Sequence, residues 1–220
     1  MILNIDKQLR NNFPEINVNL IQINDVKIKK INEQLEKVKI EIIKNVRNKY
    51  EINSLKDQHT VKVYRNFFWK IGIDPTKIRP AAEALIRRVV AGKAIPKINT
   101  LVDAYNLASI ETGIAFAAFD TDTLNGDLLM RFAEKGEQFQ GIGMKKLFIL
   151  KGEEIVISNN GKLIAIYPYR DAENTKVTEN TKNVTMITCG VPGINNKILS
   201  NATQIACSYI INFCDGKNHC

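Results

Sequence analysis

The stretch Arg79–Asp120, RPAAEALIRRVVAGKAIPKINTLVDAYNLASIETGIAFAAFD, contains two helix-like segments followed by an apolar run typical of a buried strand. Pro80 suits the first turn of the first helix, because its missing N–H would have no partner there. Asn99 is a typical N-cap for the second helix, and Gly113 stands where that helix should end. The run 114–120 has the length of one strand. This stretch therefore predicts helix, helix, strand.

Helical and strand-like periodicity extends from this stretch in both directions. Apolar residues at steps of three and four predict a helix over 27–50, and a further helical segment spans about 59–71. Residues 16–24 alternate with a period of two and then shift phase by one near Leu20, so we expect a strand with a bulge or an end there. Further strands are expected at 127–133, 153–158, 162–167 and 183–189, with an Asn160-Gly161 hairpin turn and a closing helix over 195–214.

The order of these segments is one strand, several helices, many strands and one helix. This order indicates an α+β fold rather than a regular βαβ alternation. We expect a single compact domain in which mixed or antiparallel sheet layers pack against several helices. Within it, residues 1–58 form an N-terminal strand–helix layer, residues 59–215 form the main body, and residues 216–220 form a tail.

The composition is that of a globular protein. The 220 residues are 45% hydrophobic and 25% charged, which excludes a disordered chain, a collagen-like rod and a disulfide-stapled mini-protein. No apolar run reaches the roughly 18 residues of a membrane span, and charge interrupts the first residues, unlike a secretory signal. We expect a soluble, cytoplasmic protein without a membrane partner, with its four cysteines reduced.

The positive charge is concentrated in one part of the chain. The net charge is +8, and residues 61–100 contain nine Lys and Arg against two Asp and Glu, interleaved with four aromatic residues. A basic surface of this kind attracts polyanions such as nucleic acid. On charge alone, a solvated basic face that binds nothing specific is an equally good interpretation.

Common catalytic and nucleotide-binding motifs are absent. The sequence contains no GxGxxG, no GxxxxGK[ST], no HExxH and no CxxC. Its two histidines are His59, before a helix in a polar context, and His219, the second-last residue. Both positions suit a general base poorly, so we expect neither a Ser–His–Asp enzyme nor a cofactor.

Two groups of potential metal ligands have weak spacing. They are the soft group Cys207, Cys214, His219 and Cys220, and the hard group Asp120, Asp122 and Asp127. Adjacent His219 and Cys220 rarely both reach one tetrahedral ion. The aspartates lack the spacing of an EF-hand loop and fit a polar turn. We favour buried thiols and a turn over metal sites.

The segment YRDAENTKVTENT, residues 169–181, combines an Arg–Asp pair with several hydroxyls. Arg170 binds carboxylates and Asp171 binds ammonium groups, so the two side chains are candidates for holding a small zwitterion. Thr175 and Thr178 follow at a spacing that aligns them in a tight loop. An exposed loop that uses Thr and Asn as caps explains the same composition, and composition favours it.

Several motifs taken together resemble the editing module of the bacterial phenylalanyl-tRNA synthetase β chain, the B3/B4 tRNA-binding domain. That family shows a Pro, a double Arg, Ile-Asn-x-Val-Val-Asp-x-Thr-Asn and His-Ala-Phe-Asp, in this order. The matching residues here are Pro80, Arg87, Arg88, Ile98, Asn99, Val102, Asp103, Asn106 and Ala118–Asp120. The resemblance covers roughly residues 75–190 and is most similar to the free-standing form of the module.

This resemblance implies hydrolysis of a wrongly attached amino acid from tRNA, in a pocket that holds the aminoacyl group. It makes residues 59–215 a B3/B4-like domain and suggests that the tRNA acceptor end lies along the basic segment. Asn106 takes the role of the family's pocket Asn. The residues that we expect to bind tRNA are Arg65, Lys70, Arg79, Arg87, Arg88 and Lys93.

Three positions depart from the family's pattern. Tyr105 replaces a pocket Thr, Ala117 replaces a His, and Ile187 or Thr188 stands where an acid recognises a tyrosine hydroxyl. A pocket that discriminates by a hydrogen bond loses that discrimination without the partner group, so we do not expect tyrosine specificity. The candidate pocket residues are Asn106, Tyr105, Ala117, Arg170, Asp171, Thr175 and Thr178.

Three functions follow as hypotheses. The favoured one is a trans-editing hydrolase that deacylates a mischarged tRNA with a positioned water. The second is an RNA-binding module without catalysis, which the missing pocket His motivates. The third is an enzyme that binds a free amino acid through Arg170 and Asp171.

Overall fold

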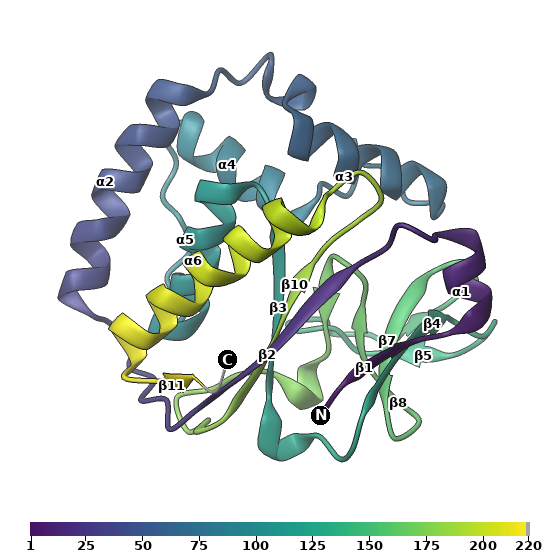
Figure 1. Ribbon diagram of the computed structural model, residues 1–220. Coiled ribbons are helices and arrows are strands. Elements are labelled where there is room, and N and C mark those ends of the chain that lie inside the picture. Colours follow the sequence, from purple (N-terminus) through teal and green to yellow (C-terminus); the bar gives the residue numbers. More distant parts are fainter. Residues whose placement is uncertain (219–220) are drawn as a thin grey trace.

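The computed structural model describes residues 1–218, whose helices and sheets form an α+β fold (Figure 1). The helices are α1 (Lys7–Asn12), α2 (Glu33–Lys49), α3 (His59–Lys70), α4 (Ala81–Val90), α5 (Thr100–Thr112) and α6 (Asn196–Cys214). The strands are β1 (Leu3–Ile5), β2 (Val18–Asn24), β3 (Ala115–Asp120), β4 (Leu128–Phe132), β5 (Gln138–Phe139), β6 (Phe148–Ile149), β7 (Ile155–Asn159), β8 (Lys162–Ile166), β9 (Arg170–Asp171), β10 (Val184–Cys189) and β11 (Lys217–Asn218). The fold class expected from the order of elements is confirmed.

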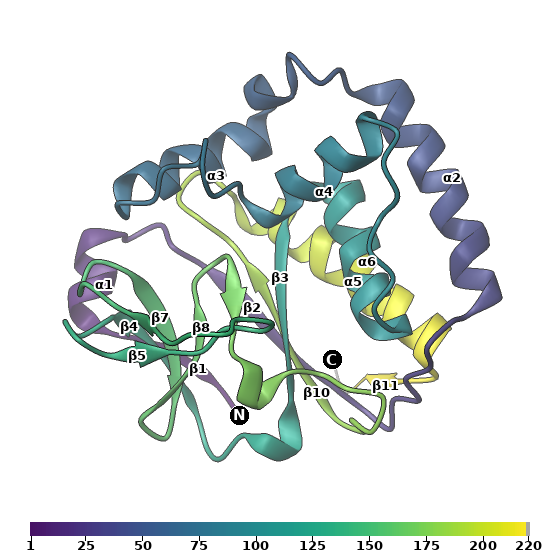
Figure 2. The same ribbon diagram turned by 180° about the vertical axis from the view of Figure 1, so that it is seen from behind.

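Two main sheets pack face to face. One has the strand order β1-β4-β7-β8-β9, with β1 parallel to β4, and the other has the antiparallel order β11-β2-β10-β3. Helices α5 and α6 cover the outer face of the second sheet, and α2 and α4 pack outside α5 (Figures 1 and 2). The core between the sheets therefore contains apolar side chains from β3, β4, β7, β8 and β10 together with α3.

The bulge expected near Leu20 is wrong, because β2 pairs with β10 without interruption over Val18–Ile23. Val18 and Leu20 pack into the core between the two sheets, whereas Ile21 and Ile23 pack against α5 and α6. Both faces of β2 are covered, so the apolar residues change phase without any change in register.

Helix α2 begins later than its periodicity predicts. Asn32 caps it by accepting hydrogen bonds from the backbone N–H groups of Gln34 (2.9 Å) and Leu35 (3.1 Å). Before the cap, the N–H of Lys29 donates to the hydroxyl of Thr100 (3.0 Å), and the N–H of Thr100 donates to the carbonyl of Lys29 (2.8 Å). These contacts tie the segment to the start of α5 and keep it out of the helix.

Local signals at the other predicted boundaries are confirmed. Asn99 caps α5 by accepting from the N–H of Val102 (2.9 Å), and Gly113 ends this helix at φ 74°. Asn160 and Gly161 both have positive φ, 48° and 78°, as a two-residue type I′ hairpin turn between β7 and β8 requires.

The hydroxyl of Tyr64 on α3 links strands β3 and β10. This buried hydroxyl donates to the carbonyl of Cys189 and accepts from the N–H of Ala115 (3.2 Å). Ala115 and Cys189 are register partners at one end of the β3–β10 ladder. The hydroxyl thus satisfies two buried backbone groups.

We expect Tyr64→Phe to lower the free energy of unfolding by about 2 kcal/mol, because it leaves these two buried groups without a partner. Urea denaturation measures the loss. Tyr209→Phe is the matched control, since the Tyr209 hydroxyl donates to the exposed Glu111 (2.6 Å) and its loss should cost less than about 1 kcal/mol. Equal losses of stability for the two variants would contradict the role of the Tyr64 hydroxyl in linking β3 to β10.

None of the helices within residues 1–218 is both long enough and apolar enough to cross a membrane.

Candidate functional site

A small cavity of about 60 Å³ lies where the two main sheets meet the start of α4. It is bounded by Phe116 and Ala117 of β3, Cys189 of β10, Ile157 of β7, the segment Ala165–Asp171, and Ala81. We call it the Asp171 cavity. Its walls are mostly apolar side chains of the central strands, so a polar group at its edge lies in a medium of low dielectric.

Asp171 supplies the carboxylate of this cavity. The residue is half-buried as a whole, whereas its carboxylate is enclosed and accepts a hydrogen bond from the N–H of Ala118 (3.4 Å). Burial raises the pKa of Asp171 from 3.8 to about 7, against the opposing effects of the Ala118 N–H and the Arg170 charge. At neutral pH this group therefore gains and loses its proton readily.

Tyr105 and Cys189 lie within the electrostatic reach of Asp171. Burial raises the pKa of both groups, and the Asp171 charge raises each pKa further. Both side chains therefore remain neutral at neutral pH. Neither one offers a positive charge to pair with the carboxylate.

Arg170 does not pair with Asp171, although the sequence motif suggested a zwitterion site. Adjacent residues of a strand point to opposite faces, and the exposed Arg170 guanidinium donates to the carbonyl of Ile142 (3.4 Å). Its aliphatic part packs so closely on Gly141 that a Cβ there would lie 2.6 Å from the Arg170 Cγ. The cavity thus has an anionic group without an ion-pair partner among the described residues.

The start of α4 borders the same cavity. Ala81 is the first residue of this helix, and its N-cap is Pro80, which makes no side-chain capping hydrogen bond. The backbone N–H groups of a first helical turn carry partial positive charge. A carbonyl oxygen that develops negative charge is favourably placed beside such an end.

Two of the departures from the family pattern lie opposite each other. Ala117 of β3 and Ile187 of β10 are register partners, and both are buried in the core between the sheets. The neighbouring Thr188 faces the other way, with its hydroxyl bonded to that of Thr203 on α6 (2.9 Å). Ile187, and not Thr188, therefore occupies the side of the ladder that faces the cavity.

The remaining predicted pocket residues lie outside the lining of the cavity. Asn106 is half-buried on α5. Thr175 is buried, and its hydroxyl has no hydrogen-bond partner within the described part of the chain. The Thr178 hydroxyl accepts from the N–H of Asn180 (3.2 Å) in a turn. The structure thus brings Ala117, Arg170 and Asp171 to the cavity, and Tyr105 close to Asp171.

Sequence reasoning missed the apolar walls. Ile157, Ala165 and Tyr167 come from strand-like segments that have the composition of any buried strand, and nothing local distinguishes a cavity wall from core. Ala81 was also missed, although the position of Pro80 does predict where its helix begins.

A cationic groove of about 370 Å³ runs along the outer side of α4. Its lining residues are Ile52, Arg79, Ala84, Arg87, Arg88, Ala91 and Lys93. Four of the six predicted tRNA-binding residues thus line one groove, and every charged residue of its lining is a cation. A groove of this kind suits phosphate groups.

Buried Glu83 holds part of this groove in place. Its carboxylate accepts hydrogen bonds from Arg87 Nε (2.8 Å) and from Arg65 (3.2 Å), and its side chain is fully buried. Arg65 is therefore committed to an internal ion pair. Arg88 donates to the carbonyl of Ala94 (2.9 Å).

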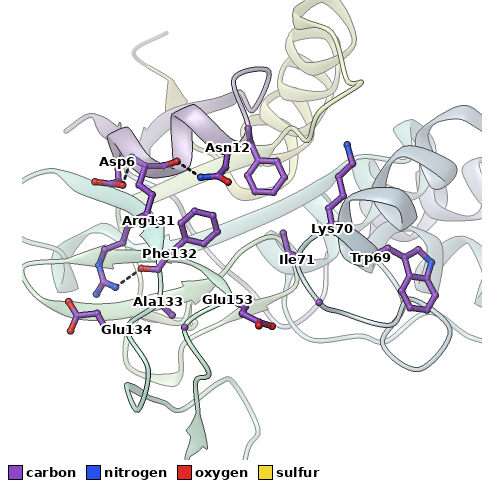
Figure 3. Close-up of a pocket in the computed structure, with 14 residues that line it drawn as sticks. Asp6, Asn12, Trp69, Lys70, Ile71, Arg131, Phe132, Ala133, Glu134 and Glu153 are labelled. Carbon is purple, nitrogen blue, oxygen red and sulfur yellow. Dashed lines mark hydrogen bonds between the residues drawn. The ribbon is translucent and has the colours of Figure 1, made fainter.

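Lys70 lies elsewhere, in a mixed-charge groove of about 770 Å³ between α1, the end of α3 and β4 (Figure 3). The charged residues of that groove are Asp6, Lys70, Arg131, Glu134 and Glu153. Arg131 is already paired with Glu137 through two hydrogen bonds of 2.9 and 2.7 Å. Three carboxylates against one unpaired lysine disfavour a phosphate backbone.

Asp120, Asp122 and Asp127 accept hydrogen bonds from within the protein. The Asp120 carboxylate accepts from the N–H of Asp122 in the same turn (3.1 Å), and the Asp122 carboxylate accepts from the Asn183 amide (3.1 Å). Asp120 accepts a hydrogen bond from the Thr181 hydroxyl (2.6 Å), and Asp127 accepts one from the N–H of Ile2 (2.9 Å). Among residues 1–218, no three His, Cys, Asp or Glu side chains gather closely enough to hold a metal ion. Of the tail group, Cys207 and Cys214 are buried in α6, and His219 and Cys220 lie outside the described residues.

Comparison with known proteins identifies the fold and the family. The structure is similar to an N-terminal fragment of the phenylalanyl-tRNA synthetase beta subunit from Pyrococcus horikoshii, with a TM-score of 0.53, 14% identity, and coverage of 99% of this chain and 50% of that one. The family model of the B3/4 domain matches residues 63–215. The chain belongs to the B3/4 domain family, and the resemblance in its sequence motifs is confirmed.

Two curated relatives are beta subunits of phenylalanine–tRNA ligase. The chain is 30% identical over 128 residues to the phenylalanine–tRNA ligase beta subunit of Protochlamydia amoebophila, which covers 58% of this chain and 15% of that protein. It is 33% identical over 113 residues to that of Fusobacterium nucleatum, covering 51% and 14%. The alignments thus include only about a seventh of these relatives' length.

Proposed function

We propose that this protein binds the acceptor end of a tRNA and hydrolyses the ester bond of a wrongly attached amino acid. The observation that carries the proposal is that the Asp171 cavity and the cationic groove both reach the start of α4. Arg79 lines the groove and Ala81 lines the cavity, and Cα atoms two residues apart are at most about 7 Å apart. RNA phosphates in the groove would bring a linked aminoacyl group to the cavity.

The unpaired carboxylate favours an esterified amino acid over a free one. A free amino acid has an ammonium and a carboxylate, so its site needs an anion and a cation. Asp171 supplies the anion, but the Arg170 guanidinium is engaged with the Ile142 carbonyl instead. An aminoacyl ester carries the ammonium alone, and this charge matches a single carboxylate.

Hydrolysis of the ester then requires two groups of the protein. Asp171 would hold the ammonium, and the start of α4 would stabilise the negative charge that develops on the ester carbonyl oxygen. Ala117 and Ile187 offer no base near the cavity, so a hydroxyl of the terminal ribose would orient the attacking water. Positioning of this kind accelerates an already reactive ester without a covalent intermediate.

The test is single-turnover deacylation of tRNAs charged with a panel of amino acids. We expect at least one member to lose its amino acid faster than in buffer alone. A panel in which no member is accelerated would contradict the proposal.

The double variant Arg79→Gln/Lys93→Gln tests the groove. These two cations have no ion pair within residues 1–218, so removing them should weaken phosphate binding without disturbing the fold. We expect KM to rise about tenfold, kcat to stay constant, and the slope of log KM against log salt to decrease by about two. Deacylation at several salt concentrations measures all three quantities.

Lys7→Gln/Lys162→Gln is the matched control, because it removes two exposed lysines from the five-stranded-sheet side of the molecule. Its KM should change less than twofold. If both double variants raise KM equally, the effect comes from net charge, and the groove has no specific role.

A second function, RNA binding without catalysis, is favoured by one observation. The register partners Ala117 and Ile187 are both apolar, so neither one can activate water. This function predicts salt-dependent tRNA binding in filter assays with no deacylation of any panel member.

A further inference from the structure

The geometry points to a size limit: the Asp171 cavity accepts an aminoacyl side chain of at most two heavy atoms, and the Tyr169 ring sets this limit. The inference rests on the proposed function and adds its substrate class, namely glycyl, alanyl or seryl esters. Family resemblance alone implies an aromatic amino acid, so the volume of the cavity and its walls carry the argument.

The volume excludes an aromatic ring. A cavity of about 150 Å³ is the known size that holds one benzene molecule, and the Asp171 cavity measures about 60 Å³. A methyl or hydroxymethyl group fits this volume, whereas a phenol does not.

The deep walls resist expansion. Ile157, Tyr167 and Cys189 are each at most 1% exposed and belong to the core between the sheets. The Tyr167 hydroxyl donates to the Gly190 carbonyl, and its ring packs edge-on against Phe67 with centroids 6.4 Å apart. Moving these side chains would open space in a close-packed core, which destabilises the fold.

The apolar character of the walls also argues against an aromatic side chain that carries a hydroxyl group. Ala117 lines the cavity, and its register partner Ile187 lies beside it in the core. Neither side chain accepts a hydrogen bond from a hydroxyl group. Burying a phenol hydroxyl without a hydrogen-bond partner is unfavourable. Tyrosine is therefore disfavoured by volume and by polarity together.

Tyr169 separates the cavity from further space. This half-buried residue lines both the Asp171 cavity and a neighbouring cavity of about 220 Å³ between residues 71–78 and 148–154. Its ring packs on Phe68 with centroids 6.1 Å apart. Removing the ring would join the two cavities, and a joined space admits a larger side chain.

The experiment compares single-turnover deacylation of one tRNA charged with alanine, serine, leucine or tyrosine. The proteins are the wild type, Tyr169→Ala and the control Tyr169→Phe, which keeps the ring. We expect the wild type to deacylate alanyl- and seryl-tRNA on the order of 100-fold faster than leucyl- and tyrosyl-tRNA. Tyr169→Ala should raise the leucyl and tyrosyl rates at least tenfold, and Tyr169→Phe should leave the ratios unchanged.

The outcomes separate this inference from the proposed function. Wild-type rates as high for tyrosyl- as for alanyl-tRNA would overturn the size limit and leave the hydrolase intact. An unchanged substrate ratio in Tyr169→Ala would overturn the role of the Tyr169 ring. Acceleration of no substrate would overturn both proposals. If urea denaturation shows that Tyr169→Ala is unfolded, Tyr169→Leu makes the same comparison with more of the packing retained.

Discussion

Asp171→Asn should lower kcat/KM for deacylation about 100-fold at pH 8, because it removes the carboxylate that the Asp171 cavity offers to an ammonium group. A charge-assisted hydrogen bond in an enclosed site contributes about 1.5–3 kcal/mol, and its loss gives a rate change of this order. The amide keeps the size of the side chain. The Ala118 N–H keeps its acceptor in the variant.

The same variant should be more stable than the wild type at pH 8. The folded-state pKa of Asp171, about 7, lies above its ordinary value of 3.8, so folding opposes ionisation. The wild type therefore loses stability as the pH rises from about 4 to about 7. The full shift corresponds to about 4 kcal/mol, and because the residue is only half-buried, we expect Asp171→Asn to gain about 2 kcal/mol.

Urea denaturation at pH 8 and pH 5 measures this gain, which should shrink at the lower pH. The wild-type kcat/KM should also fall as the pH drops below about 7, because a protonated Asp171 no longer attracts an ammonium group. Activity and the Asp171 contribution to stability thus change with pH in opposite directions. Asp122→Asn is the control, since this residue is exposed and lies outside the lining of the Asp171 cavity. Equal effects of the two substitutions would contradict the role given to Asp171.

Glu83→Ala should lower the free energy of unfolding by about 3–5 kcal/mol. Its fully buried carboxylate pairs with Arg65 and Arg87, and removing one member of a buried ion-pair network leaves uncompensated charges behind. Because α4 begins at Ala81 and Arg79 lies just before it, the loss should reach both the cationic groove and the cavity.

Chemical denaturation compares Glu83→Ala with Glu41→Ala, which truncates an exposed glutamate of α2 and should cost less than about 0.5 kcal/mol. If Glu83→Ala fails to fold, Glu83→Gln keeps the volume and should still lose more than about 1 kcal/mol. A loss from Glu83 substitution no larger than the Glu41 control would show that the Arg65–Glu83–Arg87 network is dispensable.

Features with a local cause could be predicted from the sequence. Asn99 caps its helix through its own side chain, Gly113 ends it with a left-handed backbone, and Asn160-Gly161 closes a hairpin within two residues. Each of these signals acts over a few positions. The sequence therefore predicted the corresponding helix and strand boundaries closely.

Features that depend on distant partners could not be predicted in this way. Strand β1 has three residues and exists because it pairs in parallel with β4, more than a hundred positions later. Helix α2 has its N-cap at Asn32, and does not begin at residue 27, because the Lys29 N–H is hydrogen-bonded to Thr100. Periodicity describes one segment at a time and contains no information on such pairings.

In the candidate site, too, local features could be predicted from the sequence, whereas features that depend on distant contacts could not. The alternation of side chains along a strand would have separated Arg170 from Asp171, but the strand β9 has only two residues and gave no periodic signal. Adjacent residues of a helix point in different directions, and Arg87 and Arg88 accordingly donate to Glu83 and to the Ala94 carbonyl. The size of the cavity depends on packing between sheets, which no sequence pattern shows.

A crystal structure with a short acceptor-end oligonucleotide that carries alanine through a stable amide tests the central claim most directly. The account predicts that the alanyl ammonium lies about 3 Å from the Asp171 carboxylate, with the methyl group in the Asp171 cavity and the nucleotides leading toward Arg79. An alanyl group bound in the groove beside Trp69, with no ligand at Asp171, would contradict it.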